Sequence, residues 1–448
     1  MAFSVHDLPA GSARLYVVIP VATVGFFYAS MLDYALPLYF SASNHEAVEP
    51  YPANIWSEVI KYQILPFTLG PMAAGLLSRR YGERYVWGAA LAGKVIIPLW
   101  LMARPSMAVV RGLALWQGLT ASVMWIAGLS LAQMVHPARK GFANGMLMAA
   151  LGIGSFFGPM VGRALIYNAE LRGLLAEGRA GEAAQRLLNL RPMAATPALG
   201  DFRLIFLLLT ITTLVSAVAI AAWGQRAGDF DQQPAASWAQ TLSDLARLAR
   251  LPRFWALVLT MCVLGGPLIQ SSNQFLPYRA EALGLKQGAM DAGWIWLNLL
   301  KTLMWLPGGL AVGLVAGRRA AAIVPIAIQA AFCAATFGVG FSQAAWQLFA
   351  SVAAFEFLRQ CTRWVYTGYL SEHMPSRLRA TAIGLSVSFA GTSSALFAWV
   401  AGAVWNPNLA ASRPFSQPFL AAVAMAACGC AGLFVFNLFQ PIRQPEEH

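Results

Sequence analysis

The chain has 448 residues, of which 58% are hydrophobic and only 11% are charged, and its mean hydropathy is +0.58. A soluble domain carries about 25% charged residues, so this composition excludes an ordinary water-soluble globular protein. The formal net charge of +12 does not indicate a nucleic-acid partner, because the basic residues are spread over short loops and form no single patch.

Apolar runs long enough to cross a bilayer as a helix, about 20 residues each, recur along the whole chain. A backbone in lipid must satisfy its own hydrogen bonds, which leaves helices or a closed barrel, and these runs lack the short alternating segments of barrel strands. The predicted fold class is therefore an all-α membrane protein. Twelve transmembrane helices are expected, at residues 15–41, 56–78, 85–103, 107–135, 141–167, 203–223, 254–280, 290–316, 319–341, 344–373, 378–405 and 416–440.

The basic residues are concentrated in alternate short loops. Loops that carry Lys and Arg stay in the cytoplasm, so both termini are expected there, in a multi-pass protein of a bacterial inner membrane. The first apolar run is a full span rather than the short core of a cleavable signal peptide. The basic loops hold Arg79, Arg80, Arg84, Arg139, Lys140, Arg226, Arg247, Arg250, Arg253, Arg318, Arg319, Arg377 and Arg379.

Two long connections divide the chain. Residues 168–202 form an outer-face insertion with a helix-like pattern, and residues 225–253 form a cytoplasmic linker. Within this linker, apolar residues from Trp238 onward keep helical spacing, which predicts an amphipathic helix on the membrane surface. The predicted domains are an N-terminal six-helix bundle (1–224) and a C-terminal six-helix bundle (254–448), joined by the linker.

The two halves repeat. Gly75 followed by basic residues recurs 238 positions later at Gly313. Leu36-Pro37 near the end of the first span recurs 240 positions later in the seventh. Six spans plus six with a parallel repeat is an arrangement of secondary transporters.

The turn after the second span resembles the loop between helices 2 and 3 of the major facilitator superfamily, whose pattern is Gly-x-x-x-Asp-Arg-x-Gly-Arg-Arg. Gly75, Arg80, Gly82 and Arg84 match this pattern, whereas Arg79 stands where the family has Asp and Glu83 where it has Arg. The resemblance implies two bundles related by a pseudo-twofold axis. In the family, the acidic residue of the loop helps to hold the start of helix 11. We therefore expect Arg79 to be repelled there. Either Glu83 substitutes for the acidic residue, or the transporter holds its outward-open state more weakly.

The fifth span contains Gly154, Gly158 and Pro159, and resembles the Gly-Pro motif of the superfamily's proton antiporters. Small residues four apart permit close helix approach, and the proline permits a bend. Arg163 replaces a second glycine of the motif and is interpreted, with Glu58 and Lys61, as reaching toward the membrane surface.

Ionisable groups inside a bilayer are costly, so each is a functional candidate. The resemblance implies that spans 1, 4, 7 and 10 surround the central cavity, whereas Lys94 lies in a span expected outside it and is left open between function and structure. In span 10, polar residues three and four apart share one face, which indicates either substrate contact or an ion pair that only fixes packing. The candidates are Asp33, Lys94, Arg111, Lys301, Glu356, Arg359 and Arg363.

Asp33 and Glu356 are the expected proton carriers, because a carboxylate in a low-dielectric site can take up and release a proton near neutral pH. The neutral repeat partner of Asp33 is Asn273. The predicted substrate-binding residues are Arg111, Asn273, Lys301, Arg359 and Arg363. The excess of cations over carboxylates favours an anionic solute.

The leading interpretation is a proton-coupled secondary transporter that exports a small organic, preferably anionic, compound by alternating access. The alternative is a proton symporter that imports an organic anion or metabolite, which is favoured by the symporter-like loop Ser371–Thr381. A polytopic membrane enzyme is a remote alternative, because no intramembrane His and no metal-ligand cluster is evident. We expect no cofactor and no metal, a monomer, and the bilayer, protons and a small solute as partners.

Overall fold

The structure is a computed structural model, and in its described part the chain is helical. The described residues are 13–46, 59, 62–63, 65–132, 134, 140–188, 193–224, 237–260, 268, 276, 279–280, 282–285, 297, 299–301, 303–316, 323–364, 379–404, 423–424 and 427. Their helices are α1 (Leu15–Glu46), η2 (Leu65–Thr68), α3 (Gly70–Tyr81), α4 (Glu83–Lys94), α5 (Ile96–Met102), α6 (Met107–Ala132), α7 (Lys140–Ile166), α8 (Asn168–Ala176), α9 (Ala180–Leu187), η4 (Leu199–Phe202), α10 (Arg203–Trp223), α11 (Trp238–Ala249), α12 (Pro252–Thr260), α15 (Trp305–Ala316), α16 (Ile323–Phe341), α17 (Ala345–Trp364) and α19 (Arg379–Val404).

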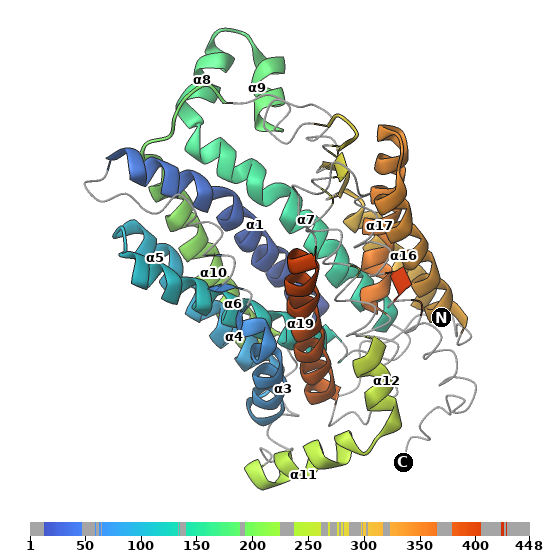
Figure 1. The fold of residues 1–448 in the computed structure, drawn as a ribbon. Coiled ribbons are helices and arrows are strands. Elements are labelled where there is room, and N and C mark those ends of the chain that lie inside the picture. Colours follow the sequence, from blue (N-terminus) through green and yellow to red (C-terminus); the bar gives the residue numbers. More distant parts are fainter. Residues whose placement is uncertain are drawn as a thin grey trace, which may run out of the picture.

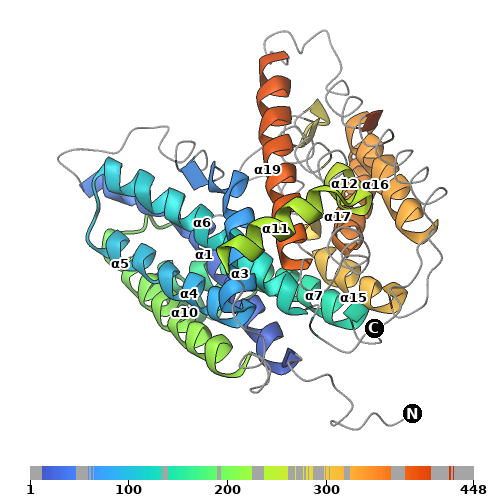
Figure 2. The same cartoon turned by 90° about the horizontal axis from the view of Figure 1, so that it is seen from below.

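Helices α1 to α10 form one bundle, and the described helices from α12 onward lie beside it (Figure 1). The view from below separates the two groups and shows α11 passing under both (Figure 2). Among the described residues, five helical segments are long and apolar enough to cross a membrane: Leu15–Ser43, Glu83–Met102, Met107–Ala132, Gly145–Ile166 and Leu199–Trp223.

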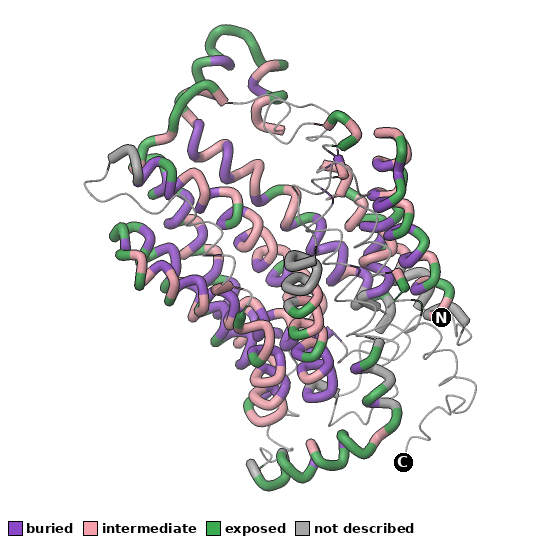
Figure 3. Tube along the Cα trace, viewed as in Figure 1, coloured by how far each residue is buried: buried purple, intermediate pink, exposed green. Residues whose placement is uncertain are grey.

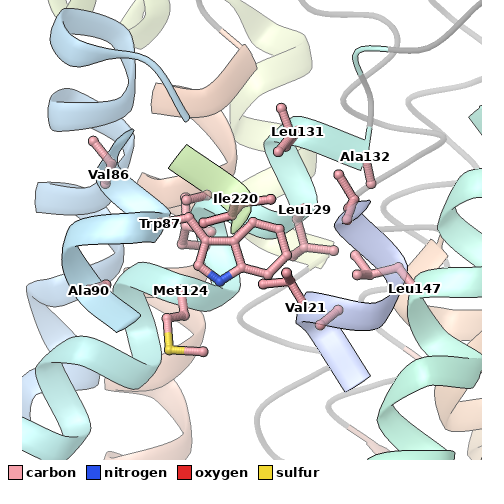
Figure 4. Close-up of a cluster of buried hydrophobic side chains, with 14 of the residues drawn as sticks. Val21, Val86, Trp87, Ala90, Met124, Leu129, Leu131, Ala132, Leu147 and Ile220 are labelled. Atoms are coloured by element: carbon pink, nitrogen blue, oxygen red, sulfur yellow. The ribbon is translucent and has the colours of Figure 1, made fainter. Parts of the chain in front are cut away.

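The N-terminal bundle packs around Trp87, which is 2% exposed (Figure 4). Its indole lies among Met124 and Leu129 of α6 and Ile220 of α10. Gly128 of α6 leaves room for the ring, since a side chain there would begin 3.3 Å from it. A large aromatic residue facing a glycine is how the bundle fills its interior without a void.

The C-terminal bundle has its own core. Phe332 of α16 and Phe355 of α17 are fully buried, and their ring centroids lie 4.8 Å apart. Leu248 of the linker helix α11 belongs to the same cluster and is also fully buried. The linker is thus packed into the second bundle.

The predicted second and third spans are both interrupted, and prolines explain both breaks. Pro66 and Pro71 flank the change from η2 to α3, and Pro98 follows the junction of α4 and α5 at Val95. Proline has no N–H and clashes with the carbonyl four residues earlier. Gly82, with φ of 87°, makes the sharp turn between α3 and α4.

The outer insertion contains α8 and α9, which project at the opposite end of the molecule from α11 (Figure 1). Figure 3 shows that these helices expose much of their surface. Arg163 of α7 is tied to this insertion, because its guanidinium donates to the carbonyl oxygens of Arg186 (3.1 Å) and Leu187 (3.3 Å). Arg163 is only 7% exposed. The expectation that it reaches the membrane surface was therefore wrong, since it supports the insertion instead.

Candidate functional site

Asp33 stands near the middle of α1 and is exposed although its neighbours Leu32 and Ala35 are buried. It lines a partly open pocket within the N-terminal bundle, whose empty space, including the part open to solvent, is about 380 Å³. The pocket is lined by Leu32, Asp33, Leu36, Phe40, Val59, Gln63, Ile97, Leu101, Val110, Leu113, Ala114 and Gln117. Its walls are apolar apart from Asp33, Gln63 and Gln117, an arrangement typical of small-molecule sites.

Gln63 and Gln117 are polar residues of this pocket that were not predicted as site residues, and Gln117, on the α6 wall, is the more deeply buried of the two. It is 4% exposed, and neither its amide nitrogen nor its amide oxygen has a hydrogen-bond partner among the described residues. Leaving such a group unpaired costs about 1–3 kcal/mol. The sequence signal was present in the Gln-Gly pair of the fourth span, where Gly118 packs on the backbone of Gln63.

Arg111 was predicted to bind substrate and lies in the first turns of α6. Its guanidinium carbon is 5.9 Å from the centroid of the Tyr62 ring, a distance that permits a cation–π interaction. It does not line the pocket that contains Asp33. Its role in substrate binding stays a prediction.

The second polar cluster lies in the C-terminal bundle around Glu356, which is fully buried. The indole N–H of Trp305 donates to its Oε2 at 2.7 Å. The Nη1 of Arg359 lies 3.2 Å from Oε2, and the Nζ of Lys301 lies 3.9 Å from Oε1. The stripe on α17 thus faces α15, and its carboxylate is shared by two cations.

Among the described side chains, this cluster has one negative and two positive members, which leaves a single positive charge. The Nε of Arg359 is buried without a hydrogen-bond partner among the described residues, while its guanidinium carbon lies 5.4 Å from the Trp305 ring centroid. Lys301 keeps 23% of its side chain exposed. A partly accessible site with excess positive charge can receive an anion.

Two predicted site residues cannot be placed in this cluster. Asn273 lies outside the described residues. Arg363 belongs to α17, but its side chain lies outside the described part. Among the described residues, no group of three or more His, Cys, Asp or Glu could hold a metal ion.

The loop motif makes contacts that the sequence did not predict. Arg79 forms an ion pair with Asp244 of α11, and both side chains are nearly buried. Glu83 accepts a hydrogen bond from the hydroxyl of Ser130 on α6, at 2.9 Å. These contacts therefore do not give Glu83 the role of the family's acidic residue, which holds the start of helix 11. Glu83 bonds within its own bundle, and Arg79 binds the linker.

The remaining residues of this motif have simpler roles. Gly75 lies in the contact between α3 and α19, because a side chain added at Gly384 would come within 3.2 Å of the Gly75 Cα. The guanidinium of Arg80 lies over Tyr81, and that of Arg84 over Tyr85. Both pairs are cation–π contacts at the end of α3 and the start of α4.

Gly154 and Gly158 of the Gly-Pro motif face α1. A side chain at Gly154 would begin 2.5 Å from the carbonyl oxygen of Thr23, and one at Gly158 would begin 2.7 Å from that of Phe27. The predicted close approach is confirmed, with α1 as the partner helix. Pro159 lies inside α7, which continues to Ile166.

A family model described as the Major Facilitator Superfamily matches residues 18–398. The chain belongs to the major facilitator superfamily. The match covers most of both bundles and agrees with the helical fold. A member of this superfamily is a multi-pass membrane protein with a transporter fold.

Solved structures of superfamily members share this fold. The fucose:proton symporter FucP of E. coli has a TM-score of 0.66 at 15% identity, over 95% of this chain and 98% of the other. The human organic anion transporter MFSD10 has a TM-score of 0.62 at 14% identity, over 94% and 98%. No curated protein sequence matches the chain. At these identities the likeness concerns the fold alone.

Proposed function

We propose that this protein is a proton-coupled secondary transporter that exports a small organic anion by alternating access. The observation that carries the solute class is the Glu356 cluster, in which Lys301 and Arg359 outnumber the carboxylate that they share. An anion that enters this site supplies the missing negative charge. The name of one fold relative, an organic anion transporter, agrees with this solute class.

The proton is assigned to Asp33 rather than shared equally with Glu356. Glu356 is fully buried, and both of its carboxylate oxygens already have partners in Trp305, Arg359 and Lys301. Asp33 is exposed to a pocket, so a proton can reach it and leave it. Glu356 then holds the two cations in place for the solute.

Export rests on the Gly-Pro motif, which resembles that of proton antiporters, together with Asp33 in α1. The close packing of Gly154 and Gly158 on α1 supports coupling in either direction, because a movement of α7 would be passed to the helix that carries the proposed proton site. The alternative direction is symport, which the loop at residues 371–381 and the name of the fucose:proton symporter favour.

Proton movement in proteoliposomes distinguishes the two directions. With an antiporter and no preformed pH gradient, solute added outside enters in exchange for protons and makes the outer solution more acidic. With a symporter, addition of the solute makes the outer solution more alkaline. Asp33→Asn should abolish gradient-driven transport while leaving solute exchange intact, and full accumulation in that variant would reject the role of Asp33.

The solute class is tested at the cationic cluster. Lys301→Gln introduces the neutral residue that the first half carries 238 positions earlier, at Gln63. It should weaken the binding of an organic anion roughly tenfold, or ~1.4 kcal/mol, and should leave the binding of a neutral analogue unchanged. Arg247→Gln, on an exposed part of α11, is the matched control. An equal loss of binding affinity for the anion and for its neutral analogue would reject the anion site.

A further inference from the structure

The two cations beside Glu356 do not share its carboxylate equally. Its Oε2 accepts the indole N–H of Trp305 at 2.7 Å and lies 3.2 Å from the Nη1 of Arg359. Its Oε1 lies 3.5 Å from the same Nη1 and 3.9 Å from the Nζ of Lys301. The last of these distances is too long for a hydrogen bond, so Lys301 interacts with the carboxylate through its charge alone.

Trp305 holds Glu356 in this position. It is the first residue of α15. Its indole N–H reaches Glu356, and its ring lies 5.4 Å from the guanidinium carbon of Arg359, both on α17. Helix α7 limits the position of Trp305 from the other bundle, because a Cβ added at Gly152 would lie 3.1 Å from the Trp305 Cβ. Trp305 is therefore held between α7 and α17.

This arrangement leaves the ammonium of Lys301 available to a solute. A buried carboxylate needs hydrogen-bond donors, and Trp305 and Arg359 supply them to Glu356. Lys301 keeps 23% of its side chain exposed, whereas Glu356 is fully buried. An anion that reaches Lys301 therefore does not have to displace a hydrogen bond between the ammonium and Glu356.

We propose that Trp305 determines the preference of this site for an anion by holding Glu356 away from Lys301. The inference rests on the proposed anion site and adds a positioning residue to it. Without the indole N–H, Oε2 loses its shortest hydrogen bond, and the buried carboxylate needs another donor. Lys301 can supply it, since an approach of about 1 Å brings its Nζ into the range of a charge-assisted hydrogen bond. The ammonium then pairs with Glu356, and an anionic solute gains less from it.

Reductive methylation of Lys301 tests the inference without a solute. Formaldehyde and a borohydride reagent methylate the amine in the purified protein, and mass spectrometry follows the peptide that contains Lys301. Trp305→Phe keeps an aromatic ring and loses the N–H. It should slow the reaction severalfold, because an amine bound to a carboxylate is less available to the reagent. Trp255→Phe is the matched control: its indole also donates at 2.7 Å, to the carbonyl oxygen of Ala249, and its loss should leave the rate unchanged.

An isosteric replacement keeps the test decisive if Trp305→Phe does not fold. Trp305→3-benzothienylalanine preserves the shape of the ring system and carries sulfur in place of the N–H. It should slow the methylation of Lys301 in the same way, although the packing against Gly152 is kept. A side chain that only fills the space between α7 and α17 would give the wild-type rate with this replacement, and that result would overturn the inference.

The binding of benzoate and of its neutral analogue benzamide measures the effect on specificity. Trp305→Phe should weaken benzoate binding by up to the roughly tenfold loss expected of Lys301→Gln and should leave benzamide binding unchanged. In a Glu356→Gln background, Trp305→Phe should not weaken benzoate further, because the competing carboxylate is gone. A further loss of benzoate affinity in that background would show that the indole acts independently of Glu356, contrary to the inference.

The results separate this inference from the proposed function. An unchanged methylation rate in both Trp305 replacements overturns the role of Trp305 and leaves the anion site at Lys301 standing. An equal loss of benzoate and benzamide binding in Lys301→Gln overturns the proposed anion site, even if methylation shows that Trp305 holds Glu356 away from Lys301.

Discussion

Glu356 shows how a single buried carboxylate organises the residues around it. It receives the indole N–H of Trp305 and lies beside Arg359 and Lys301. The spacing on α17 predicted that Glu356 and Arg359 share a face. It did not predict Trp305, because that residue comes from α15, 51 residues earlier. Helical periodicity describes one helix and says nothing about which neighbour meets its polar stripe.

Glu356→Gln should lower the stability of the folded protein, because two largely buried cations lose their counter-charge. Breaking a buried pair by removing one partner costs about 3–5 kcal/mol, so the unfolding temperature in detergent should drop clearly. Glu177→Gln, in an exposed ion pair of the outer insertion, is the control and should unfold like the wild type. Equal unfolding temperatures for the two variants would show that Glu356 does not stabilise the cluster.

Among the elements, α11 connects the two bundles. A capping box formed by Ser237 and Gln240 starts the helix, and its amphipathic pattern predicted a position on the membrane surface. Leu242 is indeed exposed, at 63%. Asp244 and Leu248, one turn apart, are buried in protein. The first pairs with Arg79 of the N-terminal bundle, and the second packs into the C-terminal core.

Charge exchange tests whether this pair holds α11 in place. Arg79→Asp brings two carboxylates together and should speed hydrogen–deuterium exchange in residues 238–249 roughly tenfold. The double variant Arg79→Asp/Asp244→Arg restores opposite charges and should return exchange toward the wild-type rate. The Glu177→Gln control should not alter it. Identical exchange in all variants would mean that Leu248 alone anchors the helix.

At the scale of the whole molecule, two helix pairs make the most extensive contacts between the described halves. Helix α7 packs on α15, and α3 packs on α19. Glycines permit both contacts: a side chain at Gly309 would begin 2.5 Å from the backbone nitrogen of Ala149, and one at Gly384 would begin 2.3 Å from the carbonyl oxygen of Pro71.

A hydrogen bond also joins α3 to α19. The N–H of Met72, in the first turn of α3, has no partner within its own helix and donates to the hydroxyl of Ser388 on α19, at 3.0 Å. The two halves are thus in direct contact between α3 and α19.

Gly384→Leu should prevent this contact, because the side chain has no space between α19 and α3. Overpacking costs about 1–3 kcal/mol, enough to shift the population toward states in which the helices separate. Spin labels at Tyr81 on α3 and Trp255 on α12 should then report longer distances, and transport should fall. Gly112→Leu is the control, since a side chain there meets nothing within 4 Å. Unchanged distances in Gly384→Leu would show that the contact between α3 and α19 does not hold the two halves together.

Composition and the length of the apolar runs determined the membrane class and the helical fold, because a spanning backbone in lipid has few other ways to satisfy its hydrogen bonds. The roles of the glycines in the α3–α4 turn and in α7 could also be predicted, because a sharp bend and a close helix approach both require a residue without a side chain. The ionisable residues could be listed, because charges inside apolar runs are rare.

Only the tertiary structure decided the partners of these residues. Lys94 meets Tyr28, Trp305 meets Glu356, and Arg79 meets Asp244, across separations of 66, 51 and 165 residues. Such pairs depend on how helices rotate and break at prolines, which a one-dimensional pattern does not contain. From the sequence, Arg79 in place of the family's Asp predicted the loss of a contact with helix 11. In the structure, Arg79 instead contacts the linker.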